Sequence, residues 1–198
     1  MATGTKQRMI ESAAELLREK GLTGMSFTDV TARSGAPRGV IYHHFPNGKV
    51  ELVRDAVRWT GGSVLAGIGH LDADTPAGLV EQFLGAIRHV LAESALGSSC
   101  AVAAVTLGTT VAGESPATDA QAALVSWIDA LAQALERLGT PADRAADVAA
   151  TLVVVLQGSH VLTRATGSLE TFDRVARVVR QAAAGALGAR WWPSAGTP

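Results

Sequence analysis

The chain has 198 residues, of which 47% are hydrophobic and 18% charged, and its formal net charge is −1. This composition excludes a disordered chain, and the length allows one core or a small head beside a larger body. No run of about 18 apolar residues lacks a polar interruption and no secretory segment opens the chain, so we expect no membrane span and a cytoplasmic protein.

Apolar periodicity and turn residues predict an N-terminal group of three helices. The first spans about residues 5–20 and ends at Gly21. A capping box over residues 26–29 starts the second, in which Val30 and Ala32 are expected to point inward. The third is expected over residues 37–45, because Pro37 suits the first position of a helix.

Six further helices are predicted by the same signals. The fourth is expected to start near residue 48 with Asn47 as its cap, and Gly61 and Gly62 are expected to kink or break it. The fifth starts at residues 75–76, the sixth covers about 102–112, and the seventh starts at 115–116 and ends at Gly139. The eighth covers about 140–165 and the ninth ends at Gly188. We therefore expect an all-α fold of about nine helices.

The second and third helices together are typical of a helix-turn-helix that places its second helix in the major groove of DNA. Gly35 suits the tight turn between them, because it adopts a positive φ at little cost. The following segment, residues 38–49, holds Arg, Tyr, two His and Lys, which are residue types that contact phosphates and base edges. Residues 1–60 also carry nine Lys and Arg against six Asp and Glu, a balance that favours contact with a polyanion.

Residues 5–53 resemble the DNA-binding domain of TetR-family transcriptional regulators. The resemblance rests on Ser26–Thr28, Ser34-Gly35, Gly39–Phe45 and Lys49. The sequence of residues 36–49 is most similar to that of the LmrA/YxaF-type branch. Val40 departs from that branch, where Ser or Ala is more frequent. The resemblance implies a helix-turn-helix domain over residues 1–50 and a helical effector-binding and dimerisation domain over 51–188. Residues 189–198 show no periodicity and are expected to form a flexible tail.

Double-stranded DNA is accordingly the expected partner of the head. Arg38 has the fork to read guanine, Gly39 permits close approach, and Val40 suits a thymine methyl. His43 is expected to touch a base or a phosphate. The residues expected to contact phosphates are Thr28, Tyr42, His44 and Lys49. Metal binding by the adjacent His43 and His44 is not expected, because neighbouring helix positions diverge.

The resemblance implies a small-molecule effector pocket in the body and a homodimer built on the eighth and ninth helices. Trp127 and His160 are the preferred lining residues, and the apolar character of the set indicates a weakly charged effector. The full set of pocket candidates is Phe83, Ile87, Cys100, Val105, Leu124, Trp127, Ile128, Gln157 and His160. The dimer candidates are Val155, Leu162, Val175, Val179, Ala182, Ala183 and Ala186.

Two other functions compete with a ligand-responsive repressor. A constitutive dimeric DNA-binding protein would keep the head and lack ligand control. An enzyme would need Cys100 as a nucleophile with His89 or His160 and an aspartate such as Asp129 or Asp147, but no flanking motif supports such a set. We therefore expect no enzyme, no cofactor and no metal. A single cysteine also excludes an internal disulfide.

Overall fold

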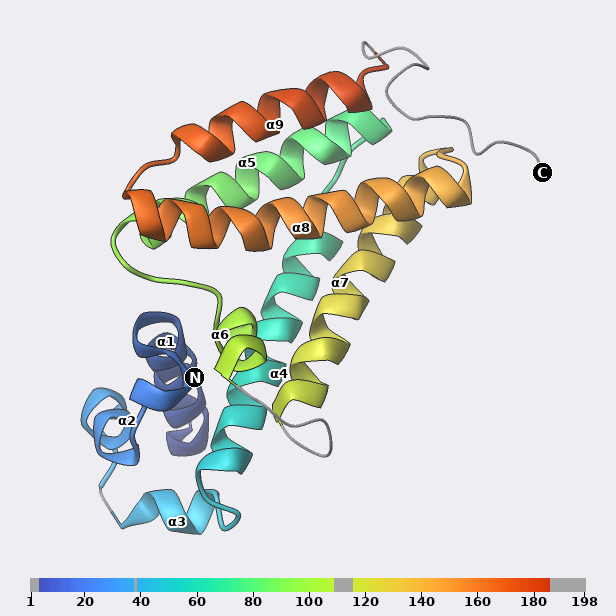
Figure 1. Cartoon of the computed structure of the whole chain (residues 1–198). Helices are drawn as coiled ribbons and strands as arrows, with labels where there is room; N and C mark the ends of the chain where they lie inside the picture. The colour runs from blue at the N-terminus through green and yellow to red at the C-terminus, as the bar shows by residue number, and fades with distance from the viewer. Residues whose placement is uncertain (1–3, 38, 109–115, 186–198) are drawn as a thin grey trace, which may run out of the picture.

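The computed structural model describes residues 4–37, 39–108 and 116–185, and over these ranges it contains helices and no strands. The head comprises α1 (Thr5–Gly24), α2 (Phe27–Ser34) and α3 (Val40–His44), as Figure 1 shows. The all-α prediction is confirmed. The body comprises α4 (Lys49–Gly69), α5 (Pro76–Ala95), α6 (Ala101–Gly108), α7 (Pro116–Arg137), α8 (Ala142–Thr166) and α9 (Glu170–Ala183).

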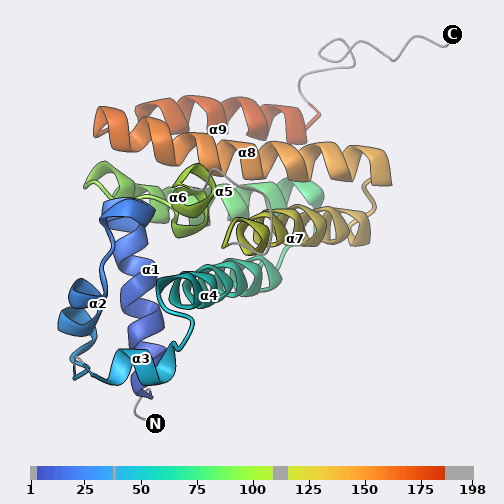
Figure 2. The ribbon, with the colours of Figure 1, turned by 60° about the horizontal axis from the view of Figure 1, so that its bottom comes forward.

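The helices form a head at one end and a layered bundle at the other (Figures 1 and 2). α4 and α7 run side by side from the head toward the bundle, and α8 crosses them together with α5 and α9. α1 packs against both α4 and α6. The head therefore contacts the body through α6 as well as through the covalent link of α4.

Side-chain caps start two helices as the sequence predicts. The Ser26 hydroxyl accepts the Asp29 backbone N–H at 3.1 Å and donates to the Asp29 carboxylate at 2.9 Å. That bond, with those from Lys20, holds the pKa of Asp29 below its ordinary value. At α5, the Thr75 hydroxyl accepts the Gly78 N–H at 3.1 Å. These caps satisfy N–H groups that the first helical turn leaves without a partner.

Two predictions about the head were wrong in detail. α3 begins at Val40 and not at Pro37, because the Val40 N–H closes a turn onto the Pro37 carbonyl at 3.0 Å. In α2, Ala32 is exposed and Thr31 is buried in its place. The Thr31 hydroxyl donates a hydrogen bond to the Phe27 carbonyl at 3.0 Å, so the buried hydroxyl is satisfied.

Glycines shape the ends of α1 and α4. Gly21 takes a φ of 71°, which breaks α1 where the sequence predicts its end, and a further turn reaches Gly24. Gly48, and not Asn47, holds the N-cap position of α4, with a φ of 72°. The Asn47 N–H instead donates to the Glu51 carboxylate at 3.0 Å. The expected kink or break in α4 is absent among its described residues, since the helix continues to Gly69.

At Gly61 the backbone of α4 closely approaches α7. A Cβ added there would lie 2.9 Å from the Ala123 Cβ, whereas a Cβ at Gly62 would meet no atom within 4 Å. The Trp127 indole N–H donates to the Gly61 carbonyl at 3.0 Å across the same contact. Gly61 is therefore a packing residue, and the prediction that it kinks or breaks the helix was wrong.

Gly61→Ala is expected to destabilise the fold by about 1–3 kcal/mol, because the added methyl group must push α4 from α7. Gly62→Ala is the matched control and should stabilise it by up to about 1 kcal/mol, the ordinary gain of alanine over glycine in a helix. Urea unfolding followed by circular dichroism measures both. Equal effects of the two substitutions would contradict this assignment of Gly61.

By length and composition alone, α8 is the one described helix that could cross a membrane. It packs on α5, α7 and α9, with Leu152 and Val153 buried, and a core helix of a folded bundle passes the same test. The opposite side of α8 exposes Val154 and Val161, which are 70% and 58% exposed. Its apolar composition thus serves a core on one side and an uncovered surface on the other.

Candidate functional site

The end of the head is formed by α3 and the start of α2, far from α8 and α9 (Figure 1). Ile41 and Phe45 are buried and anchor α3, while Tyr42 is 66% exposed. The Tyr42 ring meets Phe27 edge to face with centroids 5.5 Å apart, which places it beside exposed Thr28. The structure therefore brings the predicted contact residues of α2 and α3 to one surface.

The other predicted DNA-contact residues differ in accessibility. Gly39 and His43 are exposed, whereas Val40 and His44 are half-buried. The Lys49 ammonium donates to the Leu22 carbonyl at 2.8 Å, so it links the start of α4 to the end of α1. Arg38, the predicted base reader, lies outside the described residues.

Most of the positive charge described in the head is already paired. Lys6 lies 3.3 Å from the Asp55 carboxylate, Lys20 lies 3.3 Å from that of Asp29, and Arg33 holds Glu19 in a two-bond pair at 2.8 and 2.9 Å. The hydrogen bond from Arg33 holds the pKa of Glu19 below its ordinary value. Among the described residues of the head, the positive charge balance of residues 1–60 therefore does not form an open basic patch.

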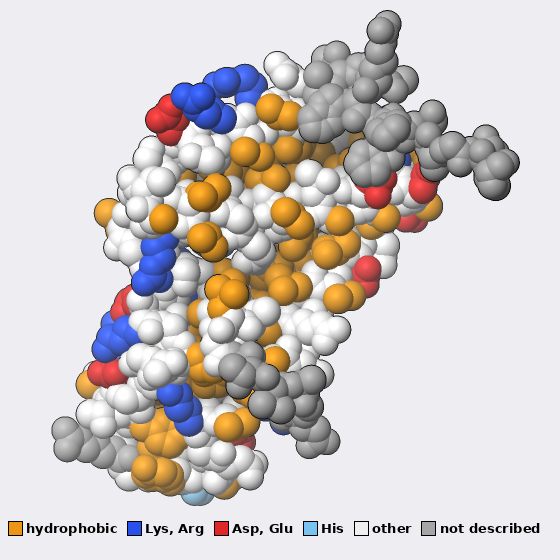
Figure 3. All heavy atoms as spheres, viewed as in Figure 1, with side chains coloured by type: hydrophobic (Ala, Val, Ile, Leu, Met, Phe, Trp, Pro, Cys, Tyr) orange, Lys and Arg blue, Asp and Glu red, His pale blue; other side chains and the backbone are white. Residues whose placement is uncertain are grey.

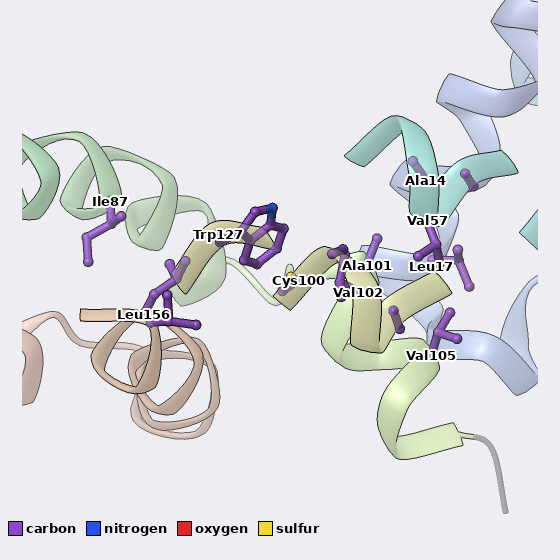
Figure 4. Packing of buried hydrophobic residues seen from close by; sticks show 14 of the residues in the cluster. Ala14, Leu17, Val57, Ile87, Cys100, Ala101, Val102, Val105, Trp127 and Leu156 are labelled. Carbon is purple, nitrogen blue, oxygen red and sulfur yellow. The ribbon is translucent and has the colours of Figure 1, made fainter. Parts of the chain in front are cut away.

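A cavity of about 370 Å³ lies inside the body, with walls from α4, α5, α6, α7 and α8. Five of the predicted pocket residues lie in its wall, and Figure 4 labels three of them, Ile87, Cys100 and Trp127, together with Leu156 of α8. Its size falls within the range of small-molecule sites. The five predicted residues in the wall are Phe83, Ile87, Cys100, Trp127 and His160.

The other four pocket candidates lie elsewhere. Val105 is fully buried, and Figure 4 shows it beside Val57 and Leu17, on the side of α6 that faces the head. Gln157 lies behind the wall, where its amide donates to the Cys100 sulfur at 3.8 Å. Leu124 and Ile128 are half-buried and pack against the core outside the wall.

One wall of the cavity, formed by α4, was not predicted from the sequence. α4 contributes residues from Trp59 to Ile68, and α1 contributes Arg18. The spacing of Thr60, Val64 and Ile68 every four residues already indicated one face of a helix. The predicted break at the glycines hid this signal. The six lining residues of α4 are Trp59, Thr60, Ser63, Val64, Gly67 and Ile68, and Leu71 follows the end of the helix.

His160 is neutral and oriented by a buried serine. It is 5% exposed, and burial together with the charge of Arg18 lowers its pKa to about 4. Its Nδ1 lies 2.7 Å from the hydroxyl oxygen of Ser94. Ser94 is fully buried, and its hydroxyl has the His160 ring as a hydrogen-bond partner. We therefore assign the hydroxyl proton to that bond, and the neutral ring carries its own proton on Nε2.

Acidification is expected to destabilise the fold through His160. The folded pKa of about 4 lies below the ordinary 6.5, so the unfolded chain binds the proton more readily and stability falls as pH drops from 6.5 toward 4. The full loss is about 3 kcal/mol. Urea unfolding at pH 7, 5.5 and 4.5 measures the free energy of unfolding of the wild type and of His160→Gln. The variant should lose less stability as the pH falls. Equal slopes in both proteins would contradict a buried neutral His160.

An ion cluster joins α4 to the start of α7. Arg54 and Arg58 each donate to one oxygen of the Asp119 carboxylate, at 2.7 and 2.8 Å. Although burial raises the pKa of Asp119, these two bonds outweigh it and hold the pKa below its ordinary value. Movement of α4 relative to α7 would therefore strain this cluster as well as the Gly61 contact.

An exposed apolar face runs along α8 and α9. In Figure 3 hydrophobic side chains gather over the middle of these helices, and charged ones lie nearer the edges. Of the predicted dimer residues, Val179 and Ala183 pack against the core of their own bundle, and Val155 is half-buried. Ala186 lies outside the described residues. The exposed apolar members of the face are Val154, Val161, Leu162, Val175, Val178 and Ala182.

The structure assembles no nucleophile and base from the enzyme alternative among the described residues. The Cys100 sulfur contacts the Gln157 amide, and His160 is bonded to Ser94. Asp129 and Asp147, the candidate acids, are exposed.

Comparison with known proteins gives the same description for both parts of the chain. Residues 9–56 match the family model "Bacterial regulatory proteins, tetR family", and residues 76–178 match "Transcriptional regulator LmrA/YxaF-like, C-terminal domain". An HTH-type transcriptional regulator of Mycobacterium tuberculosis is 32% identical over 185 residues, which cover 89% of this chain and 93% of the relative.

Solved structures share the fold over nearly the whole chain. A TetR transcriptional regulator from Legionella pneumophila has a TM-score of 0.79 at 21% identity, covering 92% of this chain and 99% of that one. The regulator FadR from Bacillus subtilis, solved in complex with stearoyl-CoA, has a TM-score of 0.60 at 12% identity, covering 89% and 96%. At such identities the likeness concerns the fold alone.

Proposed function

Because this chain belongs to the TetR family of bacterial transcriptional regulators, which are not enzymes, we propose that it is a ligand-responsive repressor. In this proposal a homodimer binds a pseudo-palindromic operator in the cytoplasm, and a small, largely apolar effector releases it. The observation that carries the proposal is the double role of α4. Its first residue, Lys49, follows the helix-turn-helix directly, and its second half forms a wall of the cavity.

That double role gives ligand binding a physical route to the head. A molecule that enters the cavity presses on α4 between Trp59 and Ile68. The same helix is tied to α7 at Gly61 and at Asp119, and to α1 through Lys49. A shift of α4 is therefore carried to α1 and α3. It displaces the two heads of a dimer from the register of the DNA groove.

The proposed DNA contacts fall into two groups. The residues that position the head on phosphates are Thr28, Tyr42, His44 and Lys49. The Lys49 ammonium donates one N–H to the Leu22 carbonyl and keeps two for a phosphate. Arg38 reads a guanine. Gly39 and Val40, which follow it directly, and His43 approach the base edges. A single α3 of five residues reads few base pairs, so two heads are needed for specificity.

The exposed face of α8 and α9 supplies the proposed dimer interface. Val154 and Val161 lie two turns apart on α8, and a Cβ added at Gly158, on the turn between them, would meet no atom within 4 Å. A small residue at that place lets a partner helix approach closely. Two copies of this face, related by a two-fold axis, form a four-helix bundle that covers both sets of apolar side chains.

An apolar effector follows from the walls of the cavity. Aliphatic and aromatic side chains, among them Trp59, Phe83 and Ile87, dominate the lining. The B. subtilis FadR complex shows that this fold holds a ligand with a long apolar chain in that protein. The effector of this chain is proposed to bury a similar apolar part against α4, α5 and α7.

Retention of the protein on DNA fragments from its genomic neighbourhood, followed by elution with candidate ligands, tests this function. A repressor with an effector retains one or a few fragments and releases them when one ligand is added. Retention that no ligand reverses would favour the constitutive DNA-binding protein. Retention of all fragments alike would contradict a specific operator.

A further inference from the structure

Arg18 is the one described residue of the head's first helix that lies in the cavity wall. Its side chain is 30% exposed. The remaining walls are formed by helices of the body, so Arg18 is the point where a bound ligand would touch the head directly. A guanidinium beside apolar walls is also a strong and directional donor.

The partners of Arg18 lie on α5 and on the loop that follows it. Its Nε donates to the Ser99 carbonyl at 3.2 Å, and its Nη2 pairs with the carboxylate of Glu93. Glu93 is the more exposed member of this pair, at 56%. The carboxylate of Glu93 thus occupies one edge of the guanidinium from the solvent side.

The end of α1 is held to the body around Arg18. The Ser99 hydroxyl donates to the Arg18 carbonyl at 2.9 Å, and the guanidinium of Arg164, on α8, donates to the carbonyls of Arg18 and Glu19 at 3.3 Å. These bonds fix the backbone from which the Arg18 side chain extends. Arg18 is therefore presented to the cavity from a rigid support.

His160 supplies a second donor at the same end of the cavity. Its Nδ1 is engaged by Ser94, so Nε2–H is the donor that remains on a ring that lies in the wall. Ser94 directly follows Glu93, the partner of Arg18, on α5, and Arg164, one turn after His160 on α8, donates to the Arg18 carbonyl, so the two groups lie in the same part of the wall. The chamber thus combines long apolar walls with a guanidinium and an imidazole N–H at one end.

We propose that the effector is an apolar molecule that carries one carboxylate, and that Arg18 binds this carboxylate in place of Glu93. This inference rests on the proposed effector function of the cavity. An arginine fork matches a carboxylate with two parallel hydrogen bonds, and the His160 N–H is a second donor in the same cavity wall. A neutral ligand offers no charged acceptor that could replace Glu93, and a cationic ligand gains nothing from the guanidinium of Arg18.

Binding of decanoate and of decanol to the full-length protein tests the inference by calorimetry. The two probes share an apolar chain and differ in the oxyanion. We expect decanoate to bind at least about 10-fold more tightly than decanol, a difference of about 1.4 kcal/mol. Arg18→Gln should remove this preference while leaving decanol affinity within about two-fold.

Two further variants separate a carboxylate site from general effects of charge. Glu93→Gln removes the competing carboxylate, so it should tighten decanoate binding and leave decanol binding unchanged. Arg33→Gln removes an arginine of the head whose partner is Glu19, away from the cavity wall, and should preserve the preference for decanoate. Thermal unfolding checks that each variant is folded.

The inference is overturned if neither probe binds, if decanol binds as tightly as decanoate, or if Arg18→Gln keeps the preference. It is overturned as well if a folded Glu93→Gln protein binds decanoate more weakly. These outcomes leave the repressor proposal standing, because retention on genomic DNA and its reversal by a different ligand are measured independently. Conversely, failure to retain specific DNA would defeat the repressor proposal without changing the two probe affinities.

Discussion

Val161→Glu is expected to convert the dimer into monomers and to weaken operator binding by at least about 100-fold. Val161 is 58% exposed on α8, within the apolar face of α8 and α9. In a two-fold dimer each copy would bury the new carboxylate without a partner, and several kcal/mol are lost for each such ion. A monomer presents one head, so it loses the gain in affinity that comes from linking two half-site contacts.

Light scattering and operator titration measure these two effects. Val125→Glu is the matched control, because Val125 is 49% exposed on α7, outside the proposed interface. It should leave both the mass and the operator affinity unchanged. Since Val161 is mostly exposed within its own chain, thermal unfolding of a monomeric form should change little. A Val161→Glu protein that keeps the dimer mass would show that this face is not the interface.

The placement of this substitution depends on the structure. Ala183 is a dimer candidate from its sequence pattern, but it is half-buried against its own bundle, and a charge there would damage the fold of one chain. Val161 and Val154 carry no periodic signal that separates a core-facing from a partner-facing position, because α8 is apolar on both sides. Only the packing of α8 on α5, α7 and α9 distinguishes the two sides.

Arg38→Ala is expected to cost about 1–3 kcal/mol of operator binding and to relax the preference at one base pair in each half-site. The guanidinium fork gives discrimination between bases, so its loss should affect the cognate operator far more than random DNA. Competition titrations with operator duplexes mutated at single positions measure the change. Equal losses on operator and random duplexes would show that Arg38 contacts phosphate and does not read a base.

Tyr42→Phe provides the contrasting variant. It removes the hydroxyl and keeps the ring that packs edge to face on Phe27, so α3 should hold its position. We expect operator and random duplexes to weaken alike, by about 1 kcal/mol, since a phosphate contact carries no sequence information. Lys49→Ala is less suitable for this comparison, because it also removes the bond to the Leu22 carbonyl.

Much of the fold was predictable because local signals determine it. The capping serine at Ser26, the Thr75-Pro76 start of α5 and Gly167, which ends α8 with a φ of 65°, each act through neighbours in sequence. The effect of Gly61 was mispredicted for the opposite reason. Its role depends on Ala123 of a helix that is distant in sequence, and a helix-breaking tendency is overridden when packing requires a small residue.

The cavity was predictable only in part for the same reason. Phe83, Ile87 and Trp127 lie on amphipathic helices whose inward faces the sequence pattern reveals. Whether an inward residue meets a cavity or the packed core depends on helices that cross it, and Val105 meets the head instead. Arg18 had no signal at all, since a charged residue near the end of an amphipathic helix is ordinarily a solvated one.

The affinity of an eluting effector, measured by calorimetry with and without saturating operator, tests the central proposal most directly. Coupling between the two sites is reciprocal, and it is typically worth about 1–3 kcal/mol. We predict that operator weakens effector binding by about 5- to 150-fold, by the same factor as the effector weakens operator binding. Equal effector affinity in the presence and absence of operator would contradict a ligand-responsive repressor.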